Sequence, residues 1–229
     1  MRVRGESQGI GRPLALLAGA LVLLMVLAQL ILPRIAASRI SSRIGRYGTV
    51  KSVKVSAWPA VKLLWGSVGS VKVKAGSLAI SPAQVAKLLW EARGVSSMDV
   101  TAERVKVGPL QISDASLRKR GAALSAAAQT TEADVRSALP AGFAVRLLRS
   151  GDGEVEVSAS GGLFGINASV LAVAGARAGK LVVHPLGLLI EGLQLTLFSD
   201  PHVQVQGVGA SVLQTQPPGY RLTMQASLD

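Results

Sequence analysis

Residues 53–75 read VKVSAWPAVKLLWGSVGSVKVKA, and this stretch decides the fold class. Apolar and polar residues alternate at both ends of it, over residues 53–57 and 71–75. Strict alternation sends successive side chains to opposite faces of a sheet, so that one face is buried and the other meets water. The stretch therefore predicts two strands that place lysines on their wet face.

The same period of two recurs along the rest of the chain. Further alternating runs lie at residues 105–107, 155–159, 193–197, 203–206 and 222–226. Two helical patterns interrupt them. One opens with Ser81-Pro82, an N-cap serine followed by an N1 proline, and the other opens with Thr131-Glu132. Glycine-rich turns join these strands, and Gly151-Asp152-Gly153 predicts a hairpin turn. Strands joined in this way predict an α+β fold built on a large antiparallel sheet.

A long apolar segment lies near the N-terminus. Leu14–Leu32 contains Gln29 as its only strongly polar residue, and a helix of that length spans the hydrocarbon core of a bilayer, about 30 Å. We expect an uncleaved transmembrane signal anchor over residues 14–32 behind a cytoplasmic basic tail over residues 1–13. A removed signal peptide is the alternative. The short basic tail favours an extracytoplasmic domain, although a plain count of flanking arginines favours the reverse.

An acid-free stretch follows the start of the chain. No aspartate or glutamate lies between Glu6 and Glu91, whereas eleven lysines and arginines do. Basic side chains of this density suit an anionic membrane surface, and a solvated face is the alternative. The residues expected to contact the membrane surface are Arg39, Arg43, Arg46, Lys51, Lys54, Lys62, Lys72 and Lys74.

Residues 33–47 predict a juxtamembrane amphipathic helix. Ile40 and Ile44 fall on one side of it, and the arginines at positions 39, 43 and 46 fall on another. Such a helix can lie along the lipid headgroups of a membrane, or it can be an ordinary surface helix with solvated arginines.

Several classes of function lack their signatures. The chain has no cysteine, no zinc-ligand spacing, no phosphate-binding glycine loop and few aromatic residues for stacking bases. Its two histidines, His184 and His202, each stand beside a proline without metal-site spacing, and no serine lies in a G-x-S-x-G motif. We therefore expect a protein that is not an enzyme, with no metal, no cofactor and no nucleic-acid partner.

The large apolar side chains gather in a few places. They fit either ordinary core packing or the lining of a lipid site, because a sheet of small valines and alanines leaves room for an acyl chain. The candidate lipid-binding residues are Trp58, Leu63, Leu64, Trp65, Leu88, Leu89, Trp90, Phe143, Leu147, Phe164 and Leu188.

Residues 53–75 combine an alternating strand, the pair Trp58-Pro59, the turn Leu63-Leu64-x-Gly66 and a second alternating strand. With the N-terminal apolar segment and the closing strands, this order resembles the actinobacterial LmeA-like phospholipid-binding family. The resemblance implies a tubular-lipid-binding-like fold, in which a long curved antiparallel sheet wraps one or two helices. It also implies a membrane-anchored or secreted envelope protein that binds phospholipid in an apolar groove and supports mannosylated lipoglycans.

Two features depart from the family pattern. Tryptophan opens the turn at Trp58-Pro59 where phenylalanine-rich versions are common, and the first half of the chain is unusually basic. We take residues 48–229 as one extracytoplasmic domain that binds phospholipid, with anionic headgroups preferred. The alternative is a non-enzymatic envelope scaffold that docks a protein or an anionic glycopolymer.

Overall fold

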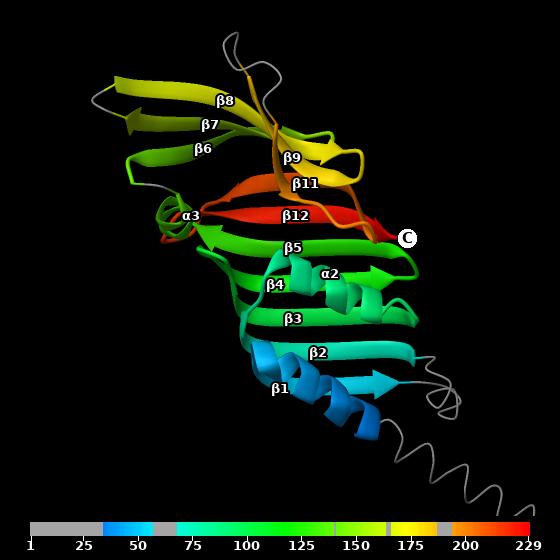
Figure 1. The fold of residues 1–229 in the computed structure, drawn as a ribbon. Helices are drawn as coiled ribbons and strands as arrows, with labels where there is room; N and C mark the ends of the chain where they lie inside the picture. The colour runs from blue at the N-terminus through cyan, green and yellow to red at the C-terminus, as the bar shows by residue number, and fades with distance from the viewer. Residues whose placement is uncertain (1–33, 57–67, 140, 164–165, 187–193) are drawn as a thin grey trace, which may run out of the picture.

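A computed structural model of the chain describes residues 34–56, 68–139, 141–163, 166–186 and 194–229. Within these residues the strands form two sheets. The first sheet has seven strands in the order β1-β2-β3-β4-β5-β12-β11, and the second has five in the order β10-β9-β8-β7-β6. Figure 1 shows the two sheets one above the other. The predicted α+β fold with a large, mostly antiparallel sheet is confirmed, but the described strands divide between two sheets instead of forming one.

The elements follow the alternating and helical patterns of the sequence. The first sheet contains β1 (Gly48–Ser56), β2 (Val68–Ala79), β3 (Val95–Val107), β4 (Leu110–Arg120), β5 (Ala123–Thr131), β11 (Val203–Leu213) and β12 (Gly219–Leu228). The second sheet contains β6 (Phe143–Gly151), β7 (Glu154–Leu163), β8 (Ile166–Arg177), β9 (Lys180–Leu186) and β10 (Leu195–Phe198). Residues 34–44 are helical and continue into η1 (Gly45–Tyr47), and the later helices are α2 (Pro82–Glu91) and α3 (Glu132–Ala138).

The two later helices begin where the sequence predicts. The Ser81 Oγ accepts a hydrogen bond from the Gln84 N–H (3.3 Å), and the Gln84 Oε1 accepts one from the Ser81 N–H (2.8 Å), which together form a capping box. The Thr131 Oγ1 accepts from the Asp134 N–H (3.0 Å) at the start of α3. Because α2 crosses between β2 and β3, these two strands run parallel.

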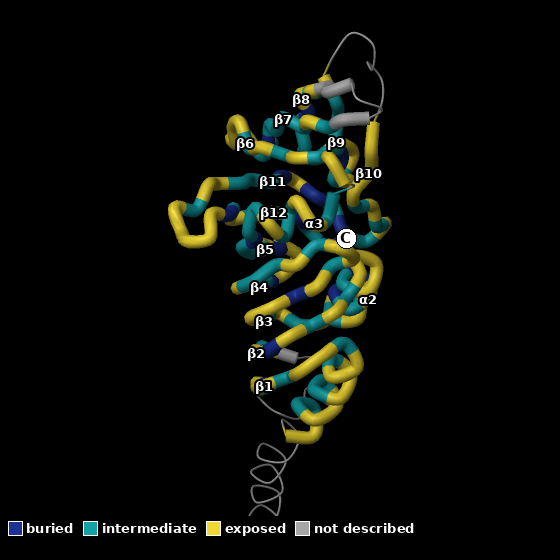
Figure 2. The backbone as a smooth tube through the Cα atoms, turned by 90° about the vertical axis from the view of Figure 1, so that its left-hand side faces the viewer, coloured by how far each residue is buried: buried dark blue, intermediate teal, exposed yellow. Residues whose placement is uncertain are grey.

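Helices pack on one face of the first sheet, which we call the inner face (Figures 1 and 2). The α2 residues Ala86 and Leu89 pack against buried side chains of β5, β11 and β12: Leu124, Val203, Ala226 and Leu228. The helix over residues 34–44 packs Ala36, Ala37, Ile40 and Ile44 against Val55, Val71 and Val73 of β1 and β2. The apolar side of this N-terminal helix therefore faces the sheet.

The second sheet meets the first along β11. The Val208 N–H donates to the Gly153 O (2.9 Å), in the β6–β7 turn, and the Val205 N–H donates to the Gly179 O (2.8 Å), in the β8–β9 turn. The backbones come so close that a Cβ on Gly207 would lie 3.1 Å from the Gly153 Cα. The hairpin turn predicted at residues 151–153 is thus confirmed, and its glycine allows the two sheets to meet.

The predicted membrane anchor, residues 14–32, and the basic tail, residues 1–13, lie outside the described residues and stay predictions. Of the helices within the described residues, none combines the length and the apolar character needed to cross a bilayer.

Candidate functional site

Apolar side chains continue along the inner face beyond the core under α2. Cross-strand pairing places Val208, Ala210 and Val212 of β11 on the same face as Leu222 and Met224 of β12. These side chains are half-buried or exposed, and Val212 keeps 59% of its surface exposed. Within the described residues they belong to none of the buried core clusters. We call this region the β11–β12 apolar face.

The second sheet has an apolar face of its own. Phe143, Val145 and Leu147 of β6 are cross-strand partners of Gly161, Ala159 and Val157 of β7, and the alternation continues to Val170 and Ala172 of β8. The Phe143 ring lies directly over Gly161, where a Cβ would come 2.5 Å from ring atoms. Large side chains on β6 therefore lie beside small ones on β7 and β8. We call this region the β6–β8 apolar face.

Tyr220 marks the place where the two faces approach each other. It lies opposite Val212 on β12, and its hydroxyl donates to the Glu132 Oε1 of α3 (3.4 Å) and lies within hydrogen-bonding reach of the Leu147 backbone on β6. Burial raises the pKa of the Tyr220 hydroxyl, and the Glu132 carboxylate raises it further. The hydroxyl is therefore a neutral polar group at the edge of apolar surface.

The structure distributes the predicted lipid-binding residues over separate places. Leu89 is buried in the core under α2, Leu88 is half-buried on the same helix, and Trp90 stacks on His202 with ring centroids 3.8 Å apart. Phe143 and Leu147 lie instead on the β6–β8 apolar face, in the other sheet. The remaining candidates lie outside the described residues: Trp58, Leu63, Leu64, Trp65, Phe164 and Leu188.

Sequence reasoning missed the apolar residues that the structure leaves accessible beside α2. Val212, Leu222 and Met224 are ordinary members of alternating strands, and their sequence does not show which strand face the helices cover. One signal was present, since the alternation shifts by one residue at Gly207 and then resumes at Val208, Ala210 and Val212, without a helix pattern to cover it.

The opposite, outer face of the first sheet is basic. Lys54 pairs with Lys72, Lys72 with Asp99, and Asp99 with Arg118, so these residues form a row across β1 to β4. In the described part of the chain, no helix lies on this face (Figure 2). The exposed side chains on this side are mostly basic, with Asp99 and Glu103 as acidic ones. The alternation is interrupted at Glu103-Arg104, where two successive residues are exposed, and near Lys51. The basic set is Lys51, Lys54, Lys72, Lys74, Arg104, Lys106, Arg118, Arg120 and Arg221.

The predicted membrane-contact residues lie at one end of the molecule but on two sides of the sheet. Arg39, Arg43 and Arg46 are exposed on the N-terminal helix and η1, on the inner side, and Arg43 pairs with Glu91 of α2 (2.7 Å). The lysines at positions 51, 54, 72 and 74 lie on the outer face of β1 and β2. Lys62 lies outside the described residues. The arginines and the lysines can therefore contact the same membrane surface only if the β1–β2 end of the first sheet points toward that surface.

Among the described residues, no three histidine, aspartate or glutamate side chains lie close enough together to hold a metal ion. Lys119 of β4 is the charged side chain that is fully buried in the part of the chain that the structure describes. It is 1% exposed, and its ammonium donates to the Arg93 O (3.2 Å) and to the Val95 O. These carbonyls follow the end of α2, so Lys119 fixes the turn from α2 into β3.

These features define a two-sheet α+β protein with accessible apolar side chains on the inner side and a basic outer face. A family model described as LmeA-like phospholipid-binding matches residues 27–226. The chain therefore belongs to the LmeA-like phospholipid-binding family, which confirms the resemblance carried by residues 53–75. Neither the curated proteins nor the solved structures contain a match to the chain.

Proposed function

We propose that this protein holds phospholipid acyl chains against the β11–β12 and β6–β8 apolar faces, next to an anionic membrane of the cell envelope. The observation that carries the proposal is the accessible inner face in a member of a phospholipid-binding family, with Val212 59% exposed. Burying one methylene is worth about 0.8 kcal/mol, so four or five methylenes in contact contribute about 3–4 kcal/mol. That is enough for an acyl chain to displace water from these faces.

The charge distribution supports an end-on approach to the membrane. The exposed arginines of the N-terminal helix and the lysines of β1 and β2 share one end of the first sheet (Figure 1). Each basic side chain near an anionic surface contributes about 1 kcal/mol. We propose that this end faces the bilayer, with the domain outside the cytoplasm, either anchored by residues 14–32 or secreted after cleavage.

Lipid extraction from the purified full-length chain tests the acyl-chain part of the proposal. The chain is isolated in a non-ionic detergent and examined by native mass spectrometry and by mass spectrometry of the extract. Co-purifying phospholipid is expected. A clean apo mass, together with no uptake of added phospholipid, would contradict the proposal and would favour a scaffold that docks a protein or an anionic glycopolymer.

Vesicle flotation tests the membrane part separately. The predicted anchor would carry the full-length chain into any bilayer, so the chain without residues 1–33 is used. We expect it to float with vesicles containing phosphatidylglycerol at low salt, to float less at high salt, and to float weakly with phosphatidylcholine alone. Screening by salt produces this pattern when exposed charges carry the contact. Equal flotation on both lipids at every salt concentration would show that the basic residues do not determine membrane contact.

A further inference from the structure

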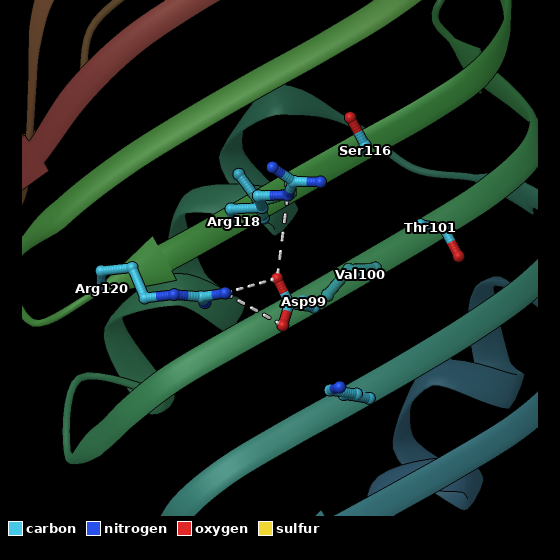
Figure 3. Close-up of a pocket in the computed structure, with 8 residues that line it drawn as sticks. Asp99, Val100, Thr101, Ser116, Arg118 and Arg120 are labelled. Carbon is cyan, nitrogen blue, oxygen red and sulfur yellow. Dashed lines mark hydrogen bonds and ion pairs between the residues drawn. The ribbon is translucent and has the colours of Figure 1, made fainter.

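A depression of about 300 Å³ lies on the outer face of the first sheet, between β2, β3 and β4. Its polar lining consists of Lys72, Asp99, Thr101, Ser116, Arg118 and Arg120. Figure 3 shows Arg118 and Arg120 of β4 directed toward the Asp99 carboxylate of β3. Its volume is at the low end of the range for small-molecule sites, about 300–1,000 Å³. The depression therefore suits a small polar group better than an acyl chain.

Asp99 organises the cationic groups of this depression. The Arg120 Nη2 lies 3.0 Å from the Asp99 Oδ1 and 3.2 Å from the Oδ2, and the Arg118 Nε lies 3.9 Å from the Oδ1. Lys72 is the cross-strand partner of Asp99 on the other side. One carboxylate thus lies among three cations, which leaves an excess of positive charge. This balance disfavours a bound cation and favours an anion.

The two arginines are held differently. The guanidinium of Arg120 also donates to the Lys119 O (2.8 Å) and the Met98 O (3.4 Å), so that most of its N–H groups are engaged. The Arg118 side chain is 72% exposed, and its Nε is at the long limit of an ion pair with Asp99. Since a guanidinium carries five N–H donors, Arg118 retains donors in a fork that matches an oxyanion.

Hydroxyl groups complete the lining. Thr101 and Ser116 are cross-strand partners, one register step of two residues from the Asp99–Arg118 pair. The Ser116 hydroxyl donates to the Ala127 O (3.3 Å), which fixes its direction. Because the Ser116 proton is used in this way, Thr101 supplies the hydroxyl donor of the lining. A hydroxyl donor beside a guanidinium fork and a lysine can bind phosphate oxygens through charge-assisted hydrogen bonds.

We propose that this depression binds a phosphate group, with Arg118 and Lys72 contacting its oxygens and with Arg120 and Asp99 positioning them. The phosphate comes either from a phospholipid headgroup or from a soluble phosphate. The site lies on the face opposite the β11–β12 apolar face, so it is a second site that does not depend on acyl-chain binding.

The test compares Arg118→Gln with Arg221→Gln, which removes the same charge from the same face but outside the depression. One arm titrates the full-length chain in non-ionic detergent with inorganic phosphate and follows the β3 and β4 amide resonances. The other arm follows the same resonances of the full-length chain in detergent micelles that contain phosphatidic acid, against micelles of matched charge that contain oleate.

We expect phosphate to shift the resonances around Asp99 and Arg118, and Arg118→Gln to weaken binding about ten-fold, as loss of a charge-assisted contact does, while Arg221→Gln changes it little. If the chain prefers phosphatidic acid to oleate and Arg118→Gln removes that preference, the bound phosphate comes from a lipid headgroup. If inorganic phosphate binds but that preference is absent, the bound phosphate is a soluble one. Absence of phosphate shifts, or equal losses in both variants, would overturn the proposal. Co-purified acyl lipid is a separate readout, so either proposal can fail alone.

Discussion

Lys54 on β1 and Lys72 on β2 are direct cross-strand partners, so two lysine side chains start from neighbouring positions on the outer face of the first sheet. Like charges opposite each other destabilise a sheet, and replacing one by an opposite charge contributes about 0.2–1 kcal/mol. We expect Lys54→Glu to raise the free energy of unfolding by that amount, in denaturant unfolding. In the chain without residues 1–33, we also expect it to weaken flotation on phosphatidylglycerol vesicles.

Lys106→Glu is the matched control for this prediction. It makes the same charge change on the outer face, but its cross-strand partners are Ala79 and Gln111. It therefore relieves no like-charge pair and leaves the free energy of unfolding unchanged. A lower free energy of unfolding for Lys54→Glu would show that the Lys54–Lys72 pair does not destabilise the sheet. Flotation equal to that of the wild type would show that the pair does not contact the membrane.

The β11–β12 apolar face is tested by two neighbouring substitutions. Val212→Asp places a carboxylate on the inner face, whereas Ser211→Asp places one on the outer face of the same strand. Because Val212 is already 59% exposed, its replacement leaves folding intact. We expect Val212→Asp to lose most of the phospholipid that co-purifies with the full-length chain, and Ser211→Asp to retain it. Equal retention of phospholipid in both variants would show that the acyl chains do not bind at the β11–β12 apolar face.

The N-cap of α2 supports the main core. Ser81→Ala removes the hydroxyl that accepts from the Gln84 N–H, and loss of such a cap costs about 1 kcal/mol of unfolding free energy. Denaturant unfolding of the full-length chain in detergent should show this loss. Ser96→Ala, at an exposed position on β3, is the control and should leave the unfolding midpoint unchanged. A neutral Ser81→Ala would mean that α2 contributes little to stability.

Lys119 predicts a pH dependence of stability. Burial lowers the pKa of its ammonium group below the ordinary lysine value, about 10.4. At lower pH both states are charged, and only the folded state bears the cost of burying the charge. As pH rises through the lowered pKa toward the ordinary value, the folded chain has released a proton that the unfolded chain still holds, so stability rises.

Lys119→Met removes this titration while keeping the length of the side chain. We therefore expect the difference in unfolding free energy, wild type minus variant, to increase with pH in the alkaline range and to level off above about 10.4. Urea unfolding at a series of pH values measures it. A difference that stays constant with pH would show that Lys119 binds its proton equally in both states.

Much of the site could not be predicted because it depends on which segments pair. The sequence marks Lys72, Asp99 and Arg118 as members of separate strands, distant along the chain, and only the β2–β3 and β3–β4 pairings bring them into one row. The apolar character of Leu88, Leu89 and Trp90 predicts a lipid site, yet Leu89 fills the core and Trp90 stacks on His202. Hydrophobicity alone does not separate a core side chain from a ligand contact.

The sequence by itself determined the strands with alternating residues, the starts of α2 and α3, the turn at residues 151–153 and the family. These features are local: alternation, a capping side chain and a glycine turn each act within a few residues. Only the tertiary structure decided that the strands divide into two sheets at β11, that helices cover one face and leave Val212 accessible, and that Lys54 lies beside Lys72. Those outcomes depend on register and packing between segments far apart in the chain, which local pattern does not specify.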